Sequence, residues 1–356
     1  MMTSGQLKGT LLEYLVRQLL QNCGFVSVKP DGHYIYQQNG SGLFFINGKG
    51  AAHDADVLME PPIQLPFAYP SRLLFECKAY KNTIGLDVVR NALGFRYDIN
   101  EFEIVSDDSI EQRKNNKRAN YAISDRKRFN YQVGVASVEH FSASAVEFAA
   151  NNKIPLFSLK WFLSEYVCNL FHDISKSYIE NIEVNLRSNI YAYLKNKRAD
   201  VINDYEGVSN FIQNDIIIGT IIREFNEKIN SSYIGLIETG DLIFLFSEQE
   251  GASNFETNQA SFDGKLAKFY YNSEEPNIWT LNLENNNRLY LSFKFFLPDG
   301  IMKLWQEYSL DKKAAIELKS QFFSRIFIFT KHQDQRRLPF FVVNIDKEWI
   351  ENIREN

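Results

Sequence analysis

Residues 71–80, "SRLLFECKAY", combine an apolar run with two charged side chains, and this stretch decides how the amino-terminal half folds. The run "LLF" predicts a buried strand. Successive side chains of a strand point to opposite faces of the sheet, so Glu76 and Lys78 share one face and Cys77 lies on the other. Opposite charges on a mostly apolar strand are costly to bury unless they pair or bind a metal ion.

Spacing alone does not single out Glu76 and Lys78. An acidic residue two positions before a lysine occurs at five places in the chain. Only Glu76 and Lys78 follow an apolar run in strand form, whereas the other pairs lie in polar, turn-forming or helical segments. These other pairs are Asp125 and Lys127, Asp263 and Lys265, Asp311 and Lys313, and Glu317 and Lys319.

The acidic partner of Glu76 is expected in "HDADV", residues 53–57, directly before the apolar run "VLM". Residues 60–71, "EPPIQLPFAYPS", hold four of the nine prolines and separate this run from "RLLFECK". Prolines exclude a helix or a central strand there, so the two runs are expected to form a hairpin with a long loop. Asp56 then lies across from Glu76, and Asp54, on the same face, is the alternative.

This arrangement predicts a metal site. Two carboxylates, Asp56 and Glu76, together with the main-chain carbonyl of Cys77, are the hard oxygen ligands that Mg2+ prefers, with Mn2+ as a substitute. A lysine beside the metal, Lys78, can hold a hydroxide or stabilise the transition state of phosphoryl transfer. The predicted chemistry is hydrolytic.

Two domains are expected from the pattern along the chain. Residues 6–22 carry leucines at helical spacing, and Glu13 falls at the margin of this apolar face. Strand-like and helical segments alternate from there, including a strand at 130–138, a serine-capped helix at 142–152 and a helix at 160–171, which indicates an α/β domain over residues 1–174. Residues 175–356 begin with a helical stretch to about 230 and continue with alternating apolar runs, which indicates a β-rich second domain.

Composition narrows the compartment and the chemistry. No run approaches the roughly 18 apolar residues of a membrane span, and the amino terminus lacks the form of a secretory signal, so we expect a cytoplasmic protein with no membrane partner. Three cysteines without paired spacing predict neither a disulfide framework nor a zinc cluster. A net charge of −5 argues against a chain that coats nucleic acid non-specifically. No nucleotide-binding glycine loop is present, which disfavours an ATP-driven mechanism.

Several blocks in order over residues 6–165 resemble the PD-(D/E)XK nuclease superfamily, and within it the Mrr-like restriction endonuclease group. They are "LKGTLLEYLVRQLLQNCGF", "GKGAAHDADV", "RLLFECKAY", "DVVRNALGF" and "GVASVEHFSASAVEFAANNKIPLFSL". The resemblance implies a restriction-endonuclease-like core, a central mixed sheet flanked by helices, followed here by the β-rich α+β second domain.

The resemblance also implies an activity: a metal-dependent endodeoxyribonuclease that hydrolyses DNA phosphodiester bonds in restriction or antiphage defence. Asp56 and Glu76 are then metal ligands, Lys78 orients the water, and Glu13 is the first-helix acid that supports the metal site. DNA is the expected partner, and because double-strand cleavage by a one-site fold needs two copies, we expect a homodimer.

Other readings compete with these assignments. In the simplest alternative Asp56, Glu76 and Lys78 are structural ion-pair residues on a sheet face. His53 and Lys81 are more often local polar residues than phosphate contacts. The seven basic residues between Arg113 and Arg128 suit either a phosphate-binding patch or a solvated loop. The aromatic residues of "SFKFF", Phe293, Phe295 and Phe296, are expected in a core and not on a base-stacking surface.

A different class of function is also open. The chain is then a nucleic-acid or protein-binding module of a multi-component defence system, acting with another protein of that system, and its nuclease site needs a partner or trigger. An intact set of Asp56, Glu76 and Lys78 favours catalysis.

Overall fold

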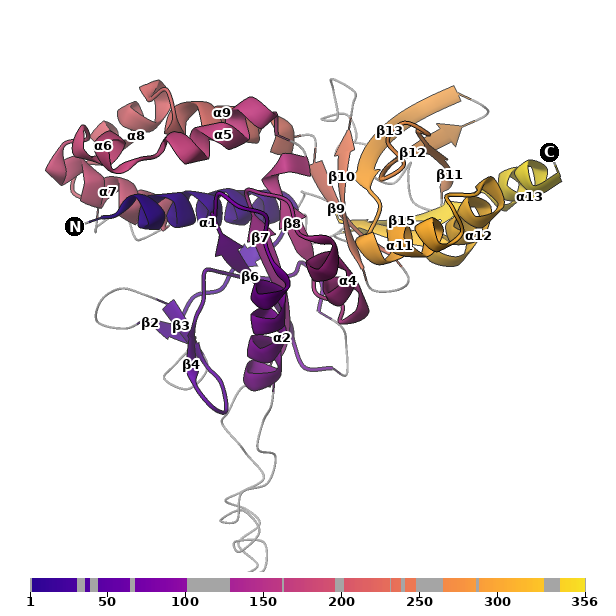
Figure 1. The fold of residues 1–356 in the computed structure, drawn as a ribbon, viewed down its shortest axis with the longest axis horizontal. Helices are drawn as coiled ribbons and strands as arrows, with labels where there is room; N and C mark the ends of the chain where they lie inside the picture. Colours follow the sequence, from indigo (N-terminus) through magenta and orange to yellow (C-terminus); the bar gives the residue numbers. More distant parts are fainter. Residues whose placement is uncertain are drawn as a thin grey trace, which may run out of the picture.

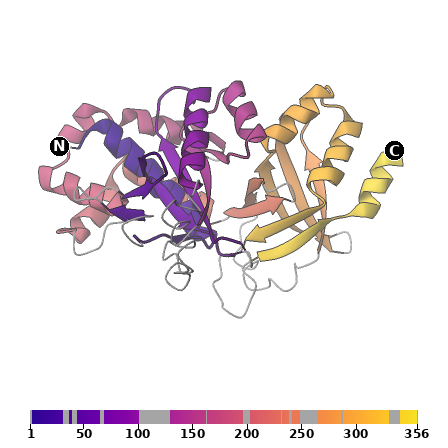
Figure 2. The ribbon, with the colours of Figure 1, turned by 90° about the horizontal axis from the view of Figure 1, so that it is seen from below.

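A computed structural model describes residues 2–30, 36–38, 44–64, 68–100, 129–161, 163–195, 202–230, 232–237, 241–247, 265–285, 288–329 and 340–355. In this part the chain forms a mixed α/β unit, with a central sheet flanked by helices, and a separate β-barrel domain. Figure 1 shows the two side by side, and Figure 2 shows the same division from below.

The first helix, α1 (Ser4–Asn22), is the centre of the α/β unit. It starts at a capping box, in which the Thr3 side chain accepts from the Gln6 N–H and the Gln6 side chain accepts from the Thr3 N–H. Its apolar face is fully buried, as the leucine spacing predicts. Figure 1 shows α1 between the sheet and an outer layer of helices, so it is covered on two sides.

The central sheet has the order β1-β5-β6-β7-β8 and is mixed. β5 pairs antiparallel with β1 and β6, whereas β6, β7 and β8 are parallel to one another. The expected hairpin between "VLM" and "RLLFECK" is therefore confirmed, with Val57 opposite Phe75. The strands are β1 (Val26–Ser27), β5 (Val57–Glu60), β6 (Ser71–Lys78), β7 (Asn130–Ser137) and β8 (Leu156–Ser158).

The two faces of the sheet belong to different apolar cores. Phe75 and Cys77 pack with α1, whereas Leu74 packs with the helices of the opposite face, so side chains of β6 alternate as expected. These helices are α2 (Leu86–Asn100) and α4 (Ala143–Asn151), and the expected Ser142 cap opens α4. A second, three-stranded sheet consists of β2 (Tyr36–Gln38), β3 (Phe44–Asn47) and β4 (Ala52–Asp54).

A layer of helices covers the other side of α1 and shares its core. Residues 160–171 were expected as one helix, but a 3-10 turn, η2 (Leu159–Trp161), comes first, and Ser164 caps a later helix. Residues from this layer, such as Ile190 and Phe225, lie in one cluster with Leu11 and Phe75. The helices are α5 (Glu165–Asp173), α6 (Lys176–Glu180), α7 (Val184–Leu194), α8 (Tyr205–Asn214) and α9 (Ile218–Ile229).

The expected boundary after residue 174 thus does not coincide with a break in packing, because α6–α9 complete the amino-terminal core. The reason is that α1 is apolar on two sides. The sheet covers only its inner side, so the helices after residue 174 are needed to cover its outer side. The change in character of the sequence at about residue 230 is where the barrel begins.

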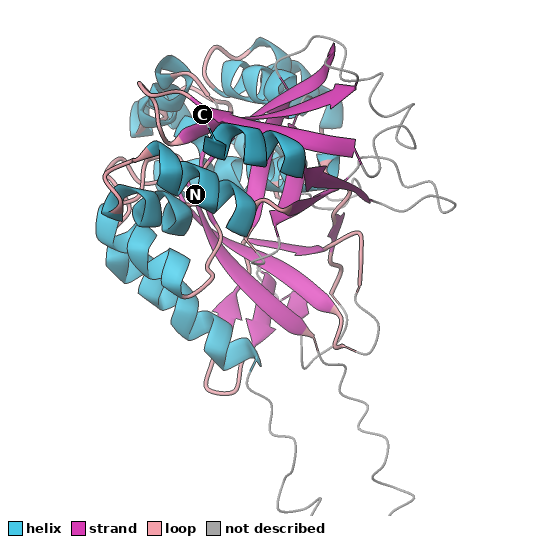
Figure 3. Cartoon of the chain, turned by 90° about the vertical axis from the view of Figure 1, so that its right-hand side faces the viewer, coloured by secondary structure: helices cyan, strands magenta, loops and turns pink. Residues whose placement is uncertain are grey.

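In the described residues the second domain is a closed seven-stranded barrel with the order β10-β13-β12-β11-β15-β14-β9. Figure 3 shows its strands beside those of the central sheet. The strands are β9 (Ser232–Ile237), β10 (Leu242–Ser247), β11 (Lys265–Tyr271), β12 (Ile278–Asn285), β13 (Arg288–Phe296), β14 (Arg325–Phe329) and β15 (Phe340–Ile345). β9 was not anticipated.

Helices α11 (Asp299–Glu307), α12 (Lys312–Phe322) and α13 (Lys347–Glu355) accompany the barrel. The segment "LPDG", residues 297–300, is expected from its sequence to form a turn between strands, but it leads into α11, with Pro298 in the N-cap position. Phe293 and Phe295 are buried inside the barrel, as expected, whereas Phe296 faces outward and stacks on Trp161 with ring centres 5.7 Å apart.

The barrel is joined to the α/β unit by apolar and ionic contacts. Ile234, Phe244 and Phe329 of the barrel strands belong to the core cluster of α1. Lys153 pairs with Asp241 at 3.0 Å, and Lys303 pairs with Glu147 on α4. A cavity of about 390 Å³ lies between α4, β10 and α11. No helix in the described residues is both long and apolar enough to cross a membrane.

The shared core predicts that damage to the helical layer loosens the sheet. Phe225→Ala removes a fully buried side chain of α9 and should lower the free energy of unfolding by about 3–5 kcal/mol. Hydrogen–deuterium exchange should quicken in α1 and β6 as well as in α9.

Ile216→Ala, at a position that is 78% exposed, is the control and should leave exchange unchanged. Faster exchange confined to α8 and α9 would show that the helical layer is a separate unit.

Candidate active site at the end of the β5–β6 hairpin

Asp56 and Glu76 come together at the end of the β5–β6 hairpin. Asp56 directly precedes β5, and because Val57 pairs with Phe75, Asp56 lies level with Glu76. The Cys77 N–H donates to Oδ2 of Asp56 at 2.9 Å. This bond fixes the carboxylate against the strand that carries Glu76 and Lys78, as the sequence predicts for Asp56.

The alternative aspartate does not share this position. Asp54 lies in β4, opposite Phe45 in the three-stranded sheet, and is exposed. Its charge acts only weakly on Asp56, as the smallest of the influences on the pKa of that carboxyl group. The geometry therefore favours Asp56 over Asp54.

Glu76 and Lys78 form an ion pair on one face of β6. Lys78 Nζ lies 3.7 Å from Oε2 of Glu76, and both side chains are mostly buried, with exposed fractions of 28% and 19%. Burial raises the pKa of Glu76, although Lys78 opposes the rise. Burial also disfavours the Lys78 ammonium, but Glu76 and Asp56 outweigh it and raise the pKa of Lys78. Lys78 is therefore a fixed positive charge and hydrogen-bond donor, and not a proton acceptor.

Glu13 reaches the same region from α1. It is 5% exposed, and burial raises its pKa to about 7, with the charge of Asp56 adding to the rise. Asp56 is half-buried, and desolvation raises its pKa against the opposing effects of the Cys77 N–H, Lys195 and Lys78. Because Asp56 interacts with both Glu13 and Glu76, it is the link between the helix acid and the strand acid.

Lys195 is a site residue that the sequence did not reveal. It follows α7, and its Nζ donates to Oε2 of Glu13, 182 residues away in the chain. No signal in "YLKNKRAD" distinguishes this lysine from a solvated one, since its role depends on how α7 packs on α1. Burial disfavours its ammonium, but Glu13 and Asp56 raise its pKa, so Lys195 is also a fixed positive charge.

His53 and Lys81 do not join the site. The His53 Nε2 lies 2.7 Å from Oδ2 of Asp98 on α2, and its ring stacks on Phe95, which matches the local role that the sequence favoured. Lys81 is exposed. The basic segment between Arg113 and Arg128 lies outside the described residues.

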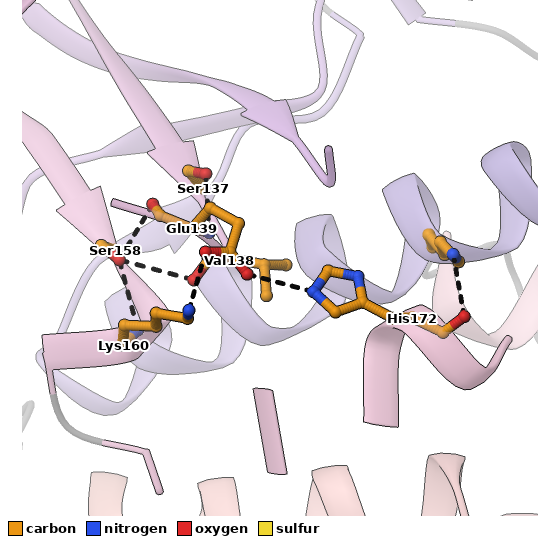
Figure 4. A network of polar contacts seen from close by, with 7 residues as sticks. Ser137, Val138, Glu139, Ser158, Lys160 and His172 are labelled. Atoms are coloured by element: carbon orange, nitrogen blue, oxygen red, sulfur yellow. Dashed lines mark hydrogen bonds and ion pairs between the residues drawn. The ribbon is translucent and has the colours of Figure 1, made fainter. Parts of the chain in front are cut away.

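A second polar network lies at the same end of the sheet, where Lys78 is level with Ser137 of β7 (Figure 4). Oε2 of Glu139 accepts from Lys160 Nζ at 2.8 Å, and Oε1 lies 3.1 Å from Nε2 of His172 on α5. Burial acts to raise the pKa of Glu139, but Lys160 and His172 outweigh it and lower that pKa. This network ties the ends of β7 and β8 to α5 through the two contacts of Glu139.

The capacity of the site for a cation follows from its charges. Glu13 is balanced by Lys195 and by the charge of Arg17, whereas Asp56 and Glu76 face Lys78, which leaves one negative charge on the Asp56–Glu76 side. Within the described residues, Oδ1 of Asp56 has no hydrogen-bond partner, since the Cys77 N–H occupies Oδ2. No group of three or more His, Cys, Asp or Glu side chains in the described part of the chain is placed to hold a metal ion, so Glu13 does not join Asp56 and Glu76 as a third close ligand.

Comparisons with known proteins add little. No protein-family model matches the chain, and no curated protein matches it. The chain is similar to the crystal structure of a protein of unknown function, AF1548, with 13% identity and a TM-score of 0.32, over 61% of this chain and 98% of the other. A likeness at that score carries no argument about fold or function.

The buried Glu13 predicts a pH dependence of stability. Its pKa in the folded chain, about 7, lies above the ordinary value of 4.5, so the folded state binds this proton more tightly than the unfolded state does. The stabilisation of the wild-type folded state by this bound proton is therefore complete below pH 4.5 and is lost as the pH rises through 7. Glu13→Gln should match wild type near pH 4 and exceed its free energy of unfolding above pH 7 by about 3 kcal/mol, at 1.4 kcal/mol per pKa unit.

Urea unfolding of both proteins between pH 4 and pH 8.5 measures this difference. Glu165→Gln, at an exposed position of α5, controls for the loss of one carboxylate. A Glu13→Gln variant that becomes less stable than wild type as the pH rises contradicts the argument.

Proposed function

We propose that this protein is a metal-dependent endonuclease that hydrolyses DNA phosphodiester bonds. The observation that carries the proposal is the meeting of Asp56, Glu76 and Lys78 at one end of the β5–β6 hairpin, in a mixed sheet flanked by helices. We further propose that this sheet, with α1 on one face and α2 and α4 on the other, is a restriction-endonuclease-like core. The blocks of sequence that resemble the Mrr-like group support this assignment.

The residues at the site suit a divalent cation. Desolvation raises the pKa values of Asp56 and Glu76, and a bound cation relieves that cost by neutralising both carboxylates. Asp56, through Oδ1, and Glu76 would hold the ion, with the main-chain carbonyl of Cys77 as a third oxygen donor. These are the ligand types that Mg2+ and Mn2+ prefer.

When bound, Mg2+ supplies positive charge that lowers the pKa of water and stabilises the negative charge of the phosphate in the transition state. Lys78, as a permanent ammonium, donates hydrogen bonds and fixes the attacking water or a phosphate oxygen beside Glu76. The apolar cores on both sides of β6 hold this strand rigid, which keeps Glu76 and Lys78 at a constant distance. The bond from phosphorus to the 3′-oxygen breaks as the water oxygen attacks; the water loses its proton to solvent and the 3′-oxygen gains one from solvent, which yields a 5′-phosphate and a 3′-hydroxyl.

The barrel is assigned the choice of target or of partner in this proposal. Its core is filled by aromatic and aliphatic side chains, so any recognition surface lies on its outside. The same proposal includes a homodimer, because one site per chain cuts one strand of the duplex. It also includes a role in restriction or defence. DNA contacts from the basic segment 113–128 are also part of it.

Plasmid cleavage by purified protein tests the proposal. Wild type with Mg2+ or Mn2+ should nick or linearise DNA, and EDTA should abolish this activity. Glu76→Ala removes a metal ligand and Lys78→Ala removes the fixed charge, so each should lower the rate at least about 100-fold. Methylated and unmethylated plasmids should both be used, since the site does not define the target.

Asp54→Asn and Lys81→Ala are matched controls, an acid and a lysine near the site in sequence but not part of it, and both should cleave like wild type. Cleavage that survives Glu76→Ala and Lys78→Ala would refute the assignment. A wild-type protein that binds DNA or another protein but cuts no substrate supports the alternative, a defence component whose site needs a partner or trigger.

A further inference from the structure

Lys195 pairs with the acid that α1 brings to the site. Its Nζ donates to Oε2 of Glu13, and the two side chains are only 16% and 7% exposed. Asp56 is close enough for its charge to act on Lys195 as well. The Lys195 ammonium therefore neutralises Glu13 on α1, whereas Lys78 pairs with Glu76 on β6.

Lys195 is not required to attach α7 to α1. The guanidinium of Arg17, itself buried, donates from Nη2 to the carbonyl oxygen of Leu194, the last residue of α7. Apolar residues of α7, among them Ile190 and Leu194, also pack in the core that contains α1. A buried ion pair contributes little net stability, because desolvation of both charges offsets their attraction. Anchoring alone therefore does not explain the Glu13–Lys195 pair.

The pairing of charges leaves a defined place for one divalent cation. Glu76 is paired with Lys78, Glu13 is paired with Lys195, and Asp56 is held by a single main-chain N–H. Without Lys195, only the charge of Arg17 would act against that of Glu13, and the Glu13 carboxylate would be free to turn toward Asp56. Glu13 and Asp56 would then be two carboxylate ligands for a second divalent cation.

We propose that Lys195 takes the place of a second metal ion: it holds Glu13 out of metal coordination and limits the site to one divalent cation, bound by Asp56 and Glu76. The inference rests on the proposed metal site. It assigns Lys195 as a positioning residue that acts through Glu13. It also makes the helical layer after residue 174 a part of the site, since α7 supplies this charge.

Counting bound Mn2+ tests the inference without any need for catalysis. The full-length chain is titrated with Mn2+ alone at pH 8 by isothermal calorimetry and, independently, by electron paramagnetic resonance of the free ion. Wild type should bind one ion per chain, and Lys195→Met should bind two because Glu13 is released. Lys195→Arg, which keeps the charge, should bind one.

The double variant Lys195→Met/Glu13→Gln separates this role from a structural one. It should return from two ions to one per chain, because the released carboxylate is gone, whereas a merely misfolded Lys195→Met protein would bind fewer ions than wild type and not more. Circular dichroism and thermal unfolding check each variant, and the wild-type count stands even if Lys195→Met does not fold.

Two ions bound to wild type, or one ion bound with unchanged affinity to a folded Lys195→Met protein, would overturn the inference while leaving the metal site in place. Asp56→Asn in the wild-type background should abolish binding. A wild type that binds no ion would overturn the proposed metal site itself, and the role of Lys195 with it.

Discussion

The hydrogen bond from the Cys77 N–H to Asp56 is the contact on which the candidate site depends. It lies at the end of the β5–β6 ladder, where the antiparallel pair separates and Asp56 is no longer held by strand pairing. The bond uses one carboxylate oxygen and leaves the other without a hydrogen-bond partner in the described part of the chain. It also holds Asp56 level with Glu76, so the pairing of β5 with β6 determines how far apart the two carboxylates lie. A slip of one residue would place every side chain of β6 on the wrong face.

The charged side chains that are buried on α1 lower the stability of the fold. Glu13 and Arg17 lie on the buried face of α1, whose other buried side chains are apolar apart from Thr10, and both are below 10% exposed. A glutamate with a pKa near 7 costs folding energy at neutral pH, and an apolar residue would avoid that cost. Sites that retain buried, mutually repelling charges do so at the expense of stability, which is a common mark of function. The position of Glu13 next to Asp56 agrees with that pattern.

Local patterns predicted the elements of the α/β unit well and the tertiary relations less well. The leucines of α1, the prolines between β5 and β6, and the serine before α4 act within a few residues, so the sequence is enough to place them. The proximity of Asp56 and Glu76 was also predictable, because the pairing of two strands in a hairpin fixes which residues lie opposite each other. Lys195 was not, because its position depends on the packing of α7 against α1 across 182 residues. The same holds for the boundary at residue 174, since a helix that lies on another helix has no distinct sequence pattern.

The barrel, in turn, is not a detachable module. Ile234, Phe244 and Phe329 belong to barrel strands but fill the core around α1, and Phe296 covers Trp161. If gene fusion or recombination gave this chain its carboxy-terminal half, apolar residues on both sides of the junction had to change before the two halves could pack together. Replacement of the barrel by that of another chain would therefore require matching changes in the residues of β8, η2 and α9 that pack against it.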